Sequence, residues 1–181
     1  LLPDEQIQKL IDTVVARGGY IKNLHGQKNV YYQINATYYS ALGEDDRKML
    51  LARALQLFMP GKPQIWYLDL FAGKNDYEAV KHAGPGGHKE INRTNLSSGQ
   101  IEAMLKRAVV AQQLQLLQMR SRYKAFSADA FITVQSDTAH MVFAWQAAGQ
   151  NAILNADLST CAFTIEVTGT DGALLFRFVQ K

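Results

Sequence analysis

The side chains best suited to acid–base or metal chemistry are four histidines and one acidic run. The histidines are His25, His82, His88 and His140. His82 and His88 are six residues apart, whereas two zinc ligands on one helix face stand at i and i+4, so solvent-exposed loop histidines are the better interpretation. The run Glu44-Asp45-Asp46 could form a catalytic cluster, but it precedes a predicted helix, and capping of that helix explains it better.

Other motifs supply no catalytic group. Gly84-Pro85-Gly86-Gly87 is followed by no Lys-Ser or Lys-Thr pair, so it predicts a flexible connection rather than a phosphate-binding loop. Cys161 is the only cysteine, which excludes an internal disulfide and fits a reducing, cytoplasmic location. No Ser-His-Asp trio or Cys-His pair stands out. The residues by themselves therefore predict a functional loop region without an evident catalytic centre.

Three helices are predicted before residue 125. The first begins near Pro3 with an apolar stripe at helical spacing and ends at Gly18-Gly19. The second covers about Glu44–Phe58 and is stopped by Pro60-Gly61-Lys62-Pro63. The third runs over about Ser98–Arg122.

One strand and two loops complete this part of the chain. Gln64–Leu70 is short, apolar and aromatic, which is typical of a strand buried on both faces, as in a parallel sheet. Tyr20–Thr37 and Ala72–Ser98 are predicted loops, and the second exceeds the roughly 12–15 residues beyond which loops in compact domains are usually functional or disordered. The order helix, loop, helix, strand, loop, helix is that of an α/β unit whose partner strands are missing.

From Ala125 onward the hydrophobic period changes to two, which predicts strands. Asp171-Gly172 between the last two apolar runs is a hairpin signal. We therefore expect a small antiparallel β unit of about 55 residues, close to the lower limit for independent folding. The alternating residues are Ile132, Val134, Met141, Phe143, Trp145, Phe163, Ile165, Val167, Leu174, Phe176 and Phe178.

Composition and charge support two units and exclude several classes of protein. Of the 181 residues, 48% are hydrophobic and 19% charged, which excludes a disordered chain or a disulfide scaffold. The net charge of +3 is too mild to indicate nucleic-acid binding, and no stretch approaches the roughly 20 apolar residues that span a bilayer. Residues 1–124 hold 17 basic and 11 acidic residues, and residues 125–181 hold 2 and 5. This change from +6 to −3 predicts a boundary between two domains, 1–124 and 125–181.

Four motifs follow one another in the first part. They are YYQINATYYSAL over residues 31–42, PGKPQIWY over 60–67, AGKND over 72–76 and EINR over 90–93. In this order and spacing they resemble the sucrose phosphorylases of the α-amylase superfamily, glycoside hydrolase family 13. The resemblance covers essentially the whole chain and is strongest from about residue 31 to residue 95.

The resemblance implies an α/β fold, the C-terminal part of a TIM (β/α)8 barrel followed by a small antiparallel β domain. Residues 1–124 would hold a loop insertion, the seventh helix, the eighth strand (Gln64–Leu68) and the eighth helix at the end of a barrel that has about 250 residues in full. Residues 125–181 would be the C-terminal β domain. The nucleophile and the acid/base of the family lie on earlier strands, so we expect them upstream of Leu1 and expect no catalytic residue in this chain.

The same resemblance assigns four residues to substrate binding. Arg93 corresponds to the arginine that hydrogen-bonds the glucosyl unit in the donor subsite, and its fixed fork of donors suits sugar hydroxyls. Tyr32 and Gln33, with Tyr31 just before them, correspond to the loop that accepts fructose or phosphate. Tyr offers a stacking face and a hydroxyl, and Gln offers both a donor and an acceptor.

The reaction implied for the intact enzyme converts sucrose and phosphate to α-glucose 1-phosphate and fructose. A carboxylate forms a glucosyl-enzyme, and inorganic phosphate then attacks it with overall retention. No metal and no organic cofactor is needed. The implied partners are a small sugar substrate, inorganic phosphate and the remainder of the same barrel, with a homodimer left open and neither nucleic acid nor membrane involved.

Two features keep other functions open. Sucrose phosphorylases tend to carry an acidic residue where Val30 stands, and the loop before Tyr31 is shorter than in that pattern. Related phosphorylases of sucrose 6-phosphate, glucosylglycerol or glucosylglycerate are therefore alternatives, as is a non-catalytic module that binds carbohydrate or completes another chain's barrel. Tyr38 and Tyr39, within the first motif, are assigned to core packing.

Overall fold

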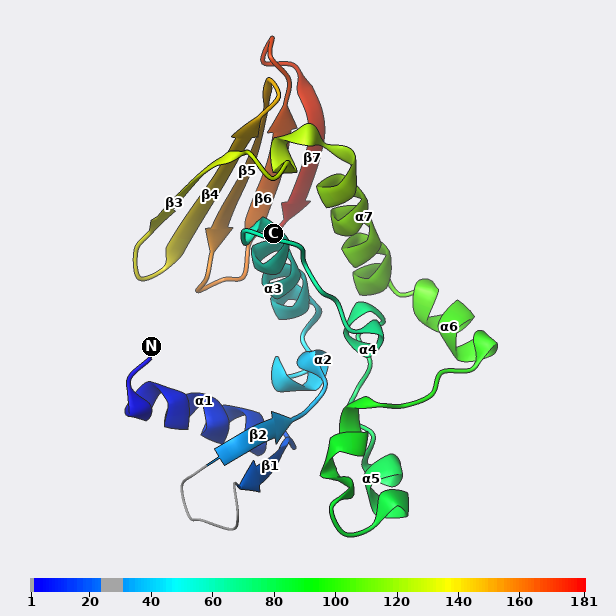
Figure 1. The fold of residues 1–181 in the computed structure, drawn as a ribbon. Helices are drawn as coiled ribbons and strands as arrows, with labels where there is room; N and C mark the ends of the chain where they lie inside the picture. Colours follow the sequence, from blue (N-terminus) through cyan, green and yellow to red (C-terminus); the bar gives the residue numbers. More distant parts are fainter. Residues whose placement is uncertain (1, 24–30) are drawn as a thin grey trace. The chain divides into compact units, whose positions relative to one another are not determined.

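The computed structural model describes residues 2–23 and 31–181 (Figure 1). It divides into two compact units. The first comprises Leu1–Met49 and Ile65–Val110, and the second comprises Leu50–Gln64 and Ala111–Lys181. The division falls within two helices, α3 (Asp46–Phe58) and α7 (Ala108–Arg122).

The first unit opens with α1 (Asp4–Ala16), which confirms the first predicted helix. Its apolar stripe is largely uncovered. Ile11 is buried, whereas Leu10 is 55% exposed. The helix is followed by Gly18, whose φ is +86°. A Cβ there would lie 2.0 Å from the Tyr77 hydroxyl, so both the backbone conformation and the close approach require glycine.

A two-stranded hairpin follows where the sequence predicted a loop over Tyr20–Thr37. Strand β1 (Tyr20–Asn23) pairs antiparallel with β2 (Tyr31–Asn35). The loop prediction is wrong for both segments, because aromatic and β-branched residues favour a strand once a partner is available. His25 and Val30, on which parts of the sequence interpretation rest, lie outside the described residues.

The predicted strand over Gln64–Leu70 does not form. Its second half is a short helix, α4 (Tyr67–Leu70), in which the Asp69 carboxylate accepts a hydrogen bond from the Tyr38 backbone N–H at 2.8 Å. Residues 64–66 belong to no strand. A buried parallel strand needs hydrogen-bonded neighbours on both sides, and no described segment pairs with these residues.

The region from residue 72 to residue 122 contains more helix than predicted. The expected loop over Ala72–Ser98 includes α5 (Tyr77–Ala83) and the 3₁₀ helix η1 (Gly87–Asn92). The expected single helix over Ser98–Arg122 is broken into α6 (Ser98–Leu105) and α7. At the break, Arg107 donates to the carbonyls of Phe71 and Ala72 at 3.1 and 2.8 Å, which ties the interruption to the AGKND motif.

The second unit confirms the predicted antiparallel β unit. Five strands pair only with their neighbours in sequence, in the order β3-β4-β5-β6-β7. The short helix η2 (Lys124–Phe126) leads into the sheet. The strands are β3 (Phe131–Ser136), β4 (His140–Ala147), β5 (Gln150–Asp157), β6 (Phe163–Thr168) and β7 (Leu174–Gln180).

Alternating burial along the strands explains the hydrophobic period of two. In β6 the residues Phe163, Ile165 and Val167 are buried, as predicted. Strand β5 was not predicted, because two of its three buried residues are alanines and the exposed Ile153 interrupts the apolar–polar alternation. Val134 and Leu174, which were predicted within the alternating set, are 51% and 55% exposed.

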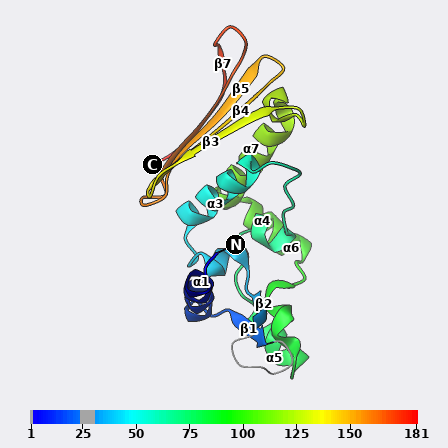
Figure 2. The ribbon, with the colours of Figure 1, turned by 60° about the vertical axis from the view of Figure 1, so that its left-hand side comes forward.

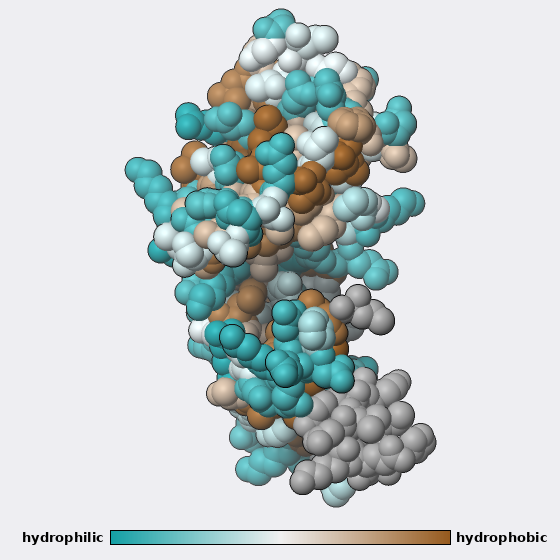
Figure 3. All heavy atoms as spheres, turned by 90° about the vertical axis from the view of Figure 1, so that its left-hand side faces the viewer, coloured by the Kyte–Doolittle hydropathy of each residue, from teal (hydrophilic) through white to brown (hydrophobic). Residues whose placement is uncertain are grey.

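One face of the sheet is covered by two helices. In Figure 2, α3 and α7 lie on the same side of the sheet. Phe58 of α3 has ring contacts with Phe126 and Phe143 at centroid distances of 5.2 and 6.4 Å, and its carbonyl accepts a hydrogen bond from Trp145 Nε1 at 2.9 Å. The other face carries exposed apolar residues such as Phe131, and a side view of the molecule shows separate hydrophobic patches among hydrophilic side chains (Figure 3).

Candidate functional site

Arg93 stands at the C-terminal end of η1 with its guanidinium half-exposed. Its backbone N–H donates to the Glu90 carbonyl at 3.1 Å. Its Nη1 is 3.7 Å from Glu90 Oε1, and 49% of the side chain is exposed. An exposed ion pair of this length contributes about 0–1 kcal/mol, and a guanidinium has five N–H donors. Most of the donor capacity of Arg93 is therefore available to a ligand.

The backbone on both sides of Arg93 is fixed by two side chains of the PGKPQIWY motif. Trp66 Nε1 donates to the Asn92 carbonyl at 2.9 Å, and the Tyr67 hydroxyl donates to the Thr94 carbonyl at 2.7 Å. Asn92 Nδ2 in turn donates to the carbonyl of Ala36 at 3.2 Å. The residues before and after Arg93 are thus held in place, and η1 is tied to the segment that follows β2.

Asp76 also holds the residues around Arg93. Its backbone N–H donates to the Ile91 carbonyl at 2.9 Å, and Oδ2 accepts from the Thr94 hydroxyl at 2.7 Å. Its Oδ1 caps α5 by accepting from the Ala79 backbone N–H at 2.9 Å. These donors, first the Ala79 backbone N–H and then the Thr94 hydroxyl, stabilise the carboxylate and hold the pKa of Asp76 below its usual range.

Asn75, the neighbour of Asp76, holds the segment that follows β2. Its Oδ1 accepts from the Thr37 backbone N–H at 2.7 Å, and its own backbone N–H donates to Ser40 Oγ at 3.0 Å. Thr37 also caps the short helix α2 (Tyr38–Ala41) by accepting from the Ser40 backbone N–H. The AGKND motif therefore positions both the end of the first motif and the residues around Arg93.

Tyr39 and Tyr38 differ in burial, although both were assigned to core packing. Tyr39 is 6% exposed, which confirms its assignment, and its hydroxyl donates to Asp46 Oδ1 at 2.8 Å. Burial and this hydrogen bond raise the pKa of Tyr39 to about 12, and the Arg107 guanidinium lies 5.3 Å from its ring centroid. Tyr38 is 44% exposed, so its core assignment is wrong.

The acidic run before α3 behaves as predicted for a helix start. Asp45 accepts from the backbone N–H groups of Arg47 and Lys48 at 2.8 and 3.1 Å. Asp46 binds Tyr39, and Glu44 forms an ion pair with Lys74 at 2.5 Å. All three carboxylates therefore have structural partners.

The predicted acceptor residues lie on β2, which η1 contacts. Gln33 is exposed and stands opposite Lys22 in the hairpin register. Tyr31 stands opposite Asn23, and Tyr32 lies between Tyr31 and Gln33. The structure thus brings the element that carries Arg93 to the strand that carries the other predicted residues, and the substrate-binding roles of all four stay predictions.

Trp66 is a candidate that the sequence interpretation missed. It was taken as one residue of a buried strand, yet it is 50% exposed while its indole N–H holds the residue before Arg93. Its ring centroid is 4.9 Å from that of Tyr67. A large exposed aromatic side chain beside the candidate arginine offers an apolar platform, and the sequence signal for it was the Trp-Tyr pair itself.

The described residues form neither a metal-binding cluster nor a helix that could span a membrane. Within residues 2–23 and 31–181, no three side chains of His, Cys, Asp or Glu come close enough together to hold a metal ion. In the same ranges no helix is both long enough and apolar enough to cross a membrane.

Comparison with known proteins gives several strong likenesses. The chain is 51% identical over 168 residues to the sucrose 6(F)-phosphate phosphorylase of Ilumatobacter coccineus, covering 91% of this chain and 32% of that protein. It is 36% identical over 164 residues to the sucrose phosphorylase of Bifidobacterium adolescentis, covering 85% and 31%. No model of a known protein family matches the chain.

A solved structure agrees with these sequence likenesses. The crystal structure of sucrose 6F-phosphate phosphorylase from Thermoanaerobacter thermosaccharolyticum superposes with a TM-score of 0.90 at 34% identity, covering 99% of this chain and 36% of that one. All three similar proteins are named as phosphorylases of sucrose or its 6-phosphate. The chain belongs to the sucrose phosphorylase family. It spans about a third of the length of the curated relatives it matches.

Proposed function

We propose that this chain is the C-terminal portion of a retaining glucosyl-transferring phosphorylase and that it supplies the rim of the substrate site. Arg93 would bind the glucosyl unit, and Gln33 with Tyr31 and Tyr32 would contact the acceptor. The observation that carries this proposal is the contact between η1 and the segment after β2, where Asn92 donates to the Ala36 carbonyl at 3.2 Å.

The reaction proposed for the whole protein is double displacement. A carboxylate supplied by the rest of the barrel attacks the anomeric carbon, and the glycosidic bond to the leaving sugar breaks with proton donation from a second carboxylic acid. Inorganic phosphate then attacks the glucosyl-enzyme, giving α-glucose 1-phosphate with retention. Arg93 contributes by orienting the glucosyl hydroxyls, and its charge does not change during the reaction.

The barrel assignment for residues 1–124, with 125–181 as the C-terminal β domain of this cytoplasmic enzyme, is part of the same proposal. Two features support it. The uncovered apolar side of α1, where Leu10 is 55% exposed, fits burial against further barrel elements. Residues Gln64–Trp66, which precede α4 and have no strand partner, fit an eighth strand that pairs only when its neighbours are present.

Phosphorolysis by the full-length protein tests the proposed function. We expect release of α-glucose 1-phosphate from sucrose or sucrose 6-phosphate in the presence of inorganic phosphate, with glucosylglycerol and glucosylglycerate as parallel substrates. The substrate with the highest kcat/KM identifies the acceptor. Absence of glucose 1-phosphate from all four substrates would contradict the proposal and favour a non-catalytic module.

A further inference from the structure

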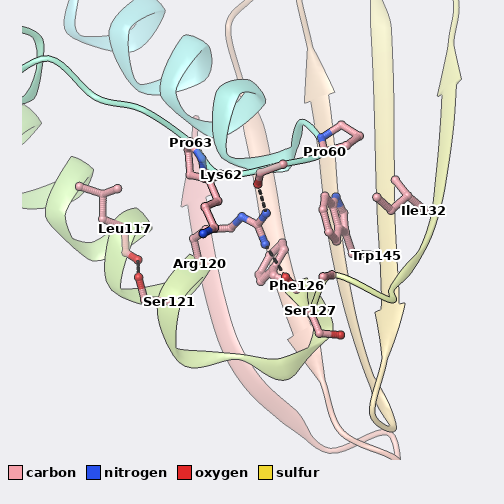
Figure 4. Close-up of a pocket in the computed structure, with 12 residues that line it drawn as sticks. Pro60, Lys62, Pro63, Leu117, Arg120, Ser121, Phe126, Ser127, Ile132 and Trp145 are labelled. Atoms are coloured by element: carbon pink, nitrogen blue, oxygen red, sulfur yellow. Dashed lines mark hydrogen bonds between the residues drawn. The ribbon is translucent and has the colours of Figure 1, made fainter.

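The second unit contains a cavity of about 720 Å³ that none of the sequence motifs predicts as a site (Figure 4). Its walls come from segment 60–63 after α3, from the C-terminal half of α7, and from residues at the start of the sheet. The volume lies within the roughly 300–1,000 Å³ that is usual for small-molecule sites. All of its walls belong to one unit.

The charged side chains in the wall are cationic. Lys62 and Arg120 line the cavity, and its lining includes neither Asp nor Glu. Figure 4 shows the two side chains reaching into the same region, from segment 60–63 and from α7. Neither has a carboxylate within 4.0 Å in the part of the chain that the structure describes. Two neighbouring cations without an anion favour an anionic ligand.

Arg120 is held in place by two donated hydrogen bonds, which use two of its five N–H donors. Its Nη1 donates to the Phe126 carbonyl at 3.0 Å and its Nη2 to the Gly61 carbonyl at 3.1 Å. Its guanidinium carbon is 4.5 Å from the ring centroids of both Phe126 and Trp145. Its Nε is buried and has no hydrogen-bond partner among the described residues. Burial also lowers the pKa of Arg120, as expected for a cation that no anion compensates.

Apart from Ser121 and Ser127, the rest of the wall is largely apolar. Pro60, Ile132 and Trp145 line one side (Figure 4). An inorganic anion bound at the two cations would leave most of 720 Å³ unfilled, whereas a molecule with a ring or short carbon chain would also cover this surface. We propose that the cavity binds a small organic anion, with a phosphate monoester or carboxylate head at Lys62 and Arg120 and its body against Pro60 and Ile132.

Calorimetric titration of the full-length protein tests this proposal. The probes are phenyl phosphate and benzoate, which carry the two kinds of anionic group on a ring. Phenol has the ring without the anionic group, and inorganic phosphate has the anionic group without the ring. The variants are Lys62→Gln, which removes one cation, and Ile132→Trp, which fills the cavity without changing its charge. Lys124→Gln is the matched control, because Lys124 is an exposed lysine of the same unit that does not line the cavity.

At the site that depends on Lys62, we expect phenyl phosphate or benzoate to bind more tightly than phenol and than inorganic phosphate. Lys62→Gln should weaken that binding about tenfold, as loss of one charge-assisted hydrogen bond does. Ile132→Trp should abolish it, and Lys124→Gln should leave it unchanged. Thermal unfolding of each variant establishes that it is folded, and Lys62→Gln, an exposed position, decides the matter should Ile132→Trp unfold.

Three results would overturn the proposal. Equal affinity in wild type and Lys62→Gln would place the probe elsewhere in the protein. Phenol binding as tightly as phenyl phosphate would remove the role of the anion. Inorganic phosphate that binds as tightly as phenyl phosphate, and that is weakened equally by Lys62→Gln, would remove the role of the organic part of the ligand. None of these outcomes bears on phosphorolysis, so the cavity proposal can fail while the proposed function stands.

Discussion

The two units are stabilised by different kinds of interaction. In the second unit, Leu154 and Ile165 are completely buried within a sheet whose strands pair with their sequence neighbours. In the first unit, the loops around Arg93 are fixed by polar side chains of Trp66 and Asp76 that bind backbone groups or neighbouring hydroxyls. Apolar burial contributes much free energy without specifying position, whereas each hydrogen bond contributes about 0.5–1.5 kcal/mol but fixes one geometry.

This difference predicts that substitutions in the two units have different consequences. Substitution of a buried apolar residue in the second unit should lower the free energy of unfolding most. Substitution of a hydrogen-bonding residue in the first unit should lower it less and should mainly displace the segment that carries Arg93.

The largest effect is expected in the sheet, where Leu154 and Ile153 are neighbours on β5. Leu154→Ala should lower the free energy of unfolding by about 2–5 kcal/mol, because Leu154 is 0% exposed and a cavity would remain. Ile153→Ala is the matched control, since Ile153 is 44% exposed on the other face, and surface substitutions usually stay within about 0.5 kcal/mol. Urea unfolding of the full-length protein measures both. Equal losses would contradict the account of a one-sided core.

A smaller effect is expected at Asp76. Asp76→Ala removes the cap of α5 and the bond from the Thr94 hydroxyl, and should lower local stability by about 1 kcal/mol. Hydrogen exchange of the Ala79 amide measures it. Glu78→Ala is the control, because the Glu78 side chain is 76% exposed and its ion pair with Lys81 spans 3.9 Å.

The same amide should report a pH dependence. The pKa of Asp76 is lowered in the folded protein from an ordinary value of 3.8. Its contribution is therefore fully present above pH 3.8 and is lost as the pH falls through the lowered value. Protection of Ala79 should decrease with acid in this range in wild type but not in Asp76→Asn. Identical acid profiles in the two proteins would contradict the role given to the carboxylate.

The sequence predicted the second unit better than the first, for a physical reason. Alternating burial gives residues such as Phe163 and Ile165 a period that can be read from the chain. The first unit depends on single long-range hydrogen bonds, such as Asn75 to Thr37 across 38 positions, which leave no periodic signal. The strand expected at Gln64–Leu70 was wrong because strand formation depends on neighbours, whereas apolar composition does not.

The candidate site was predicted through motif resemblance rather than from chemistry at single positions. Arg93 lies beside an acidic residue, Glu90, in an ordinary surface ion pair, and nothing in its local sequence separates it from other arginines. Trp66 was missed because a large aromatic residue in an apolar run predicts burial, whereas its side chain is 50% exposed and its indole N–H donates to the Asn92 carbonyl.

The most direct test of the central claim is the kcat/KM for phosphorolysis of full-length Arg93→Ala beside Lys89→Ala. Lys89 is an exposed cation on the same helix η1, so it controls for charge and for disturbance of the helix. The account predicts a loss of about 10- to 100-fold for Arg93→Ala, the effect of removing a charge-assisted hydrogen bond, with unchanged unfolding and near wild-type values for Lys89→Ala. Equal kcat/KM values for the two variants would contradict the assignment of Arg93 to the substrate site.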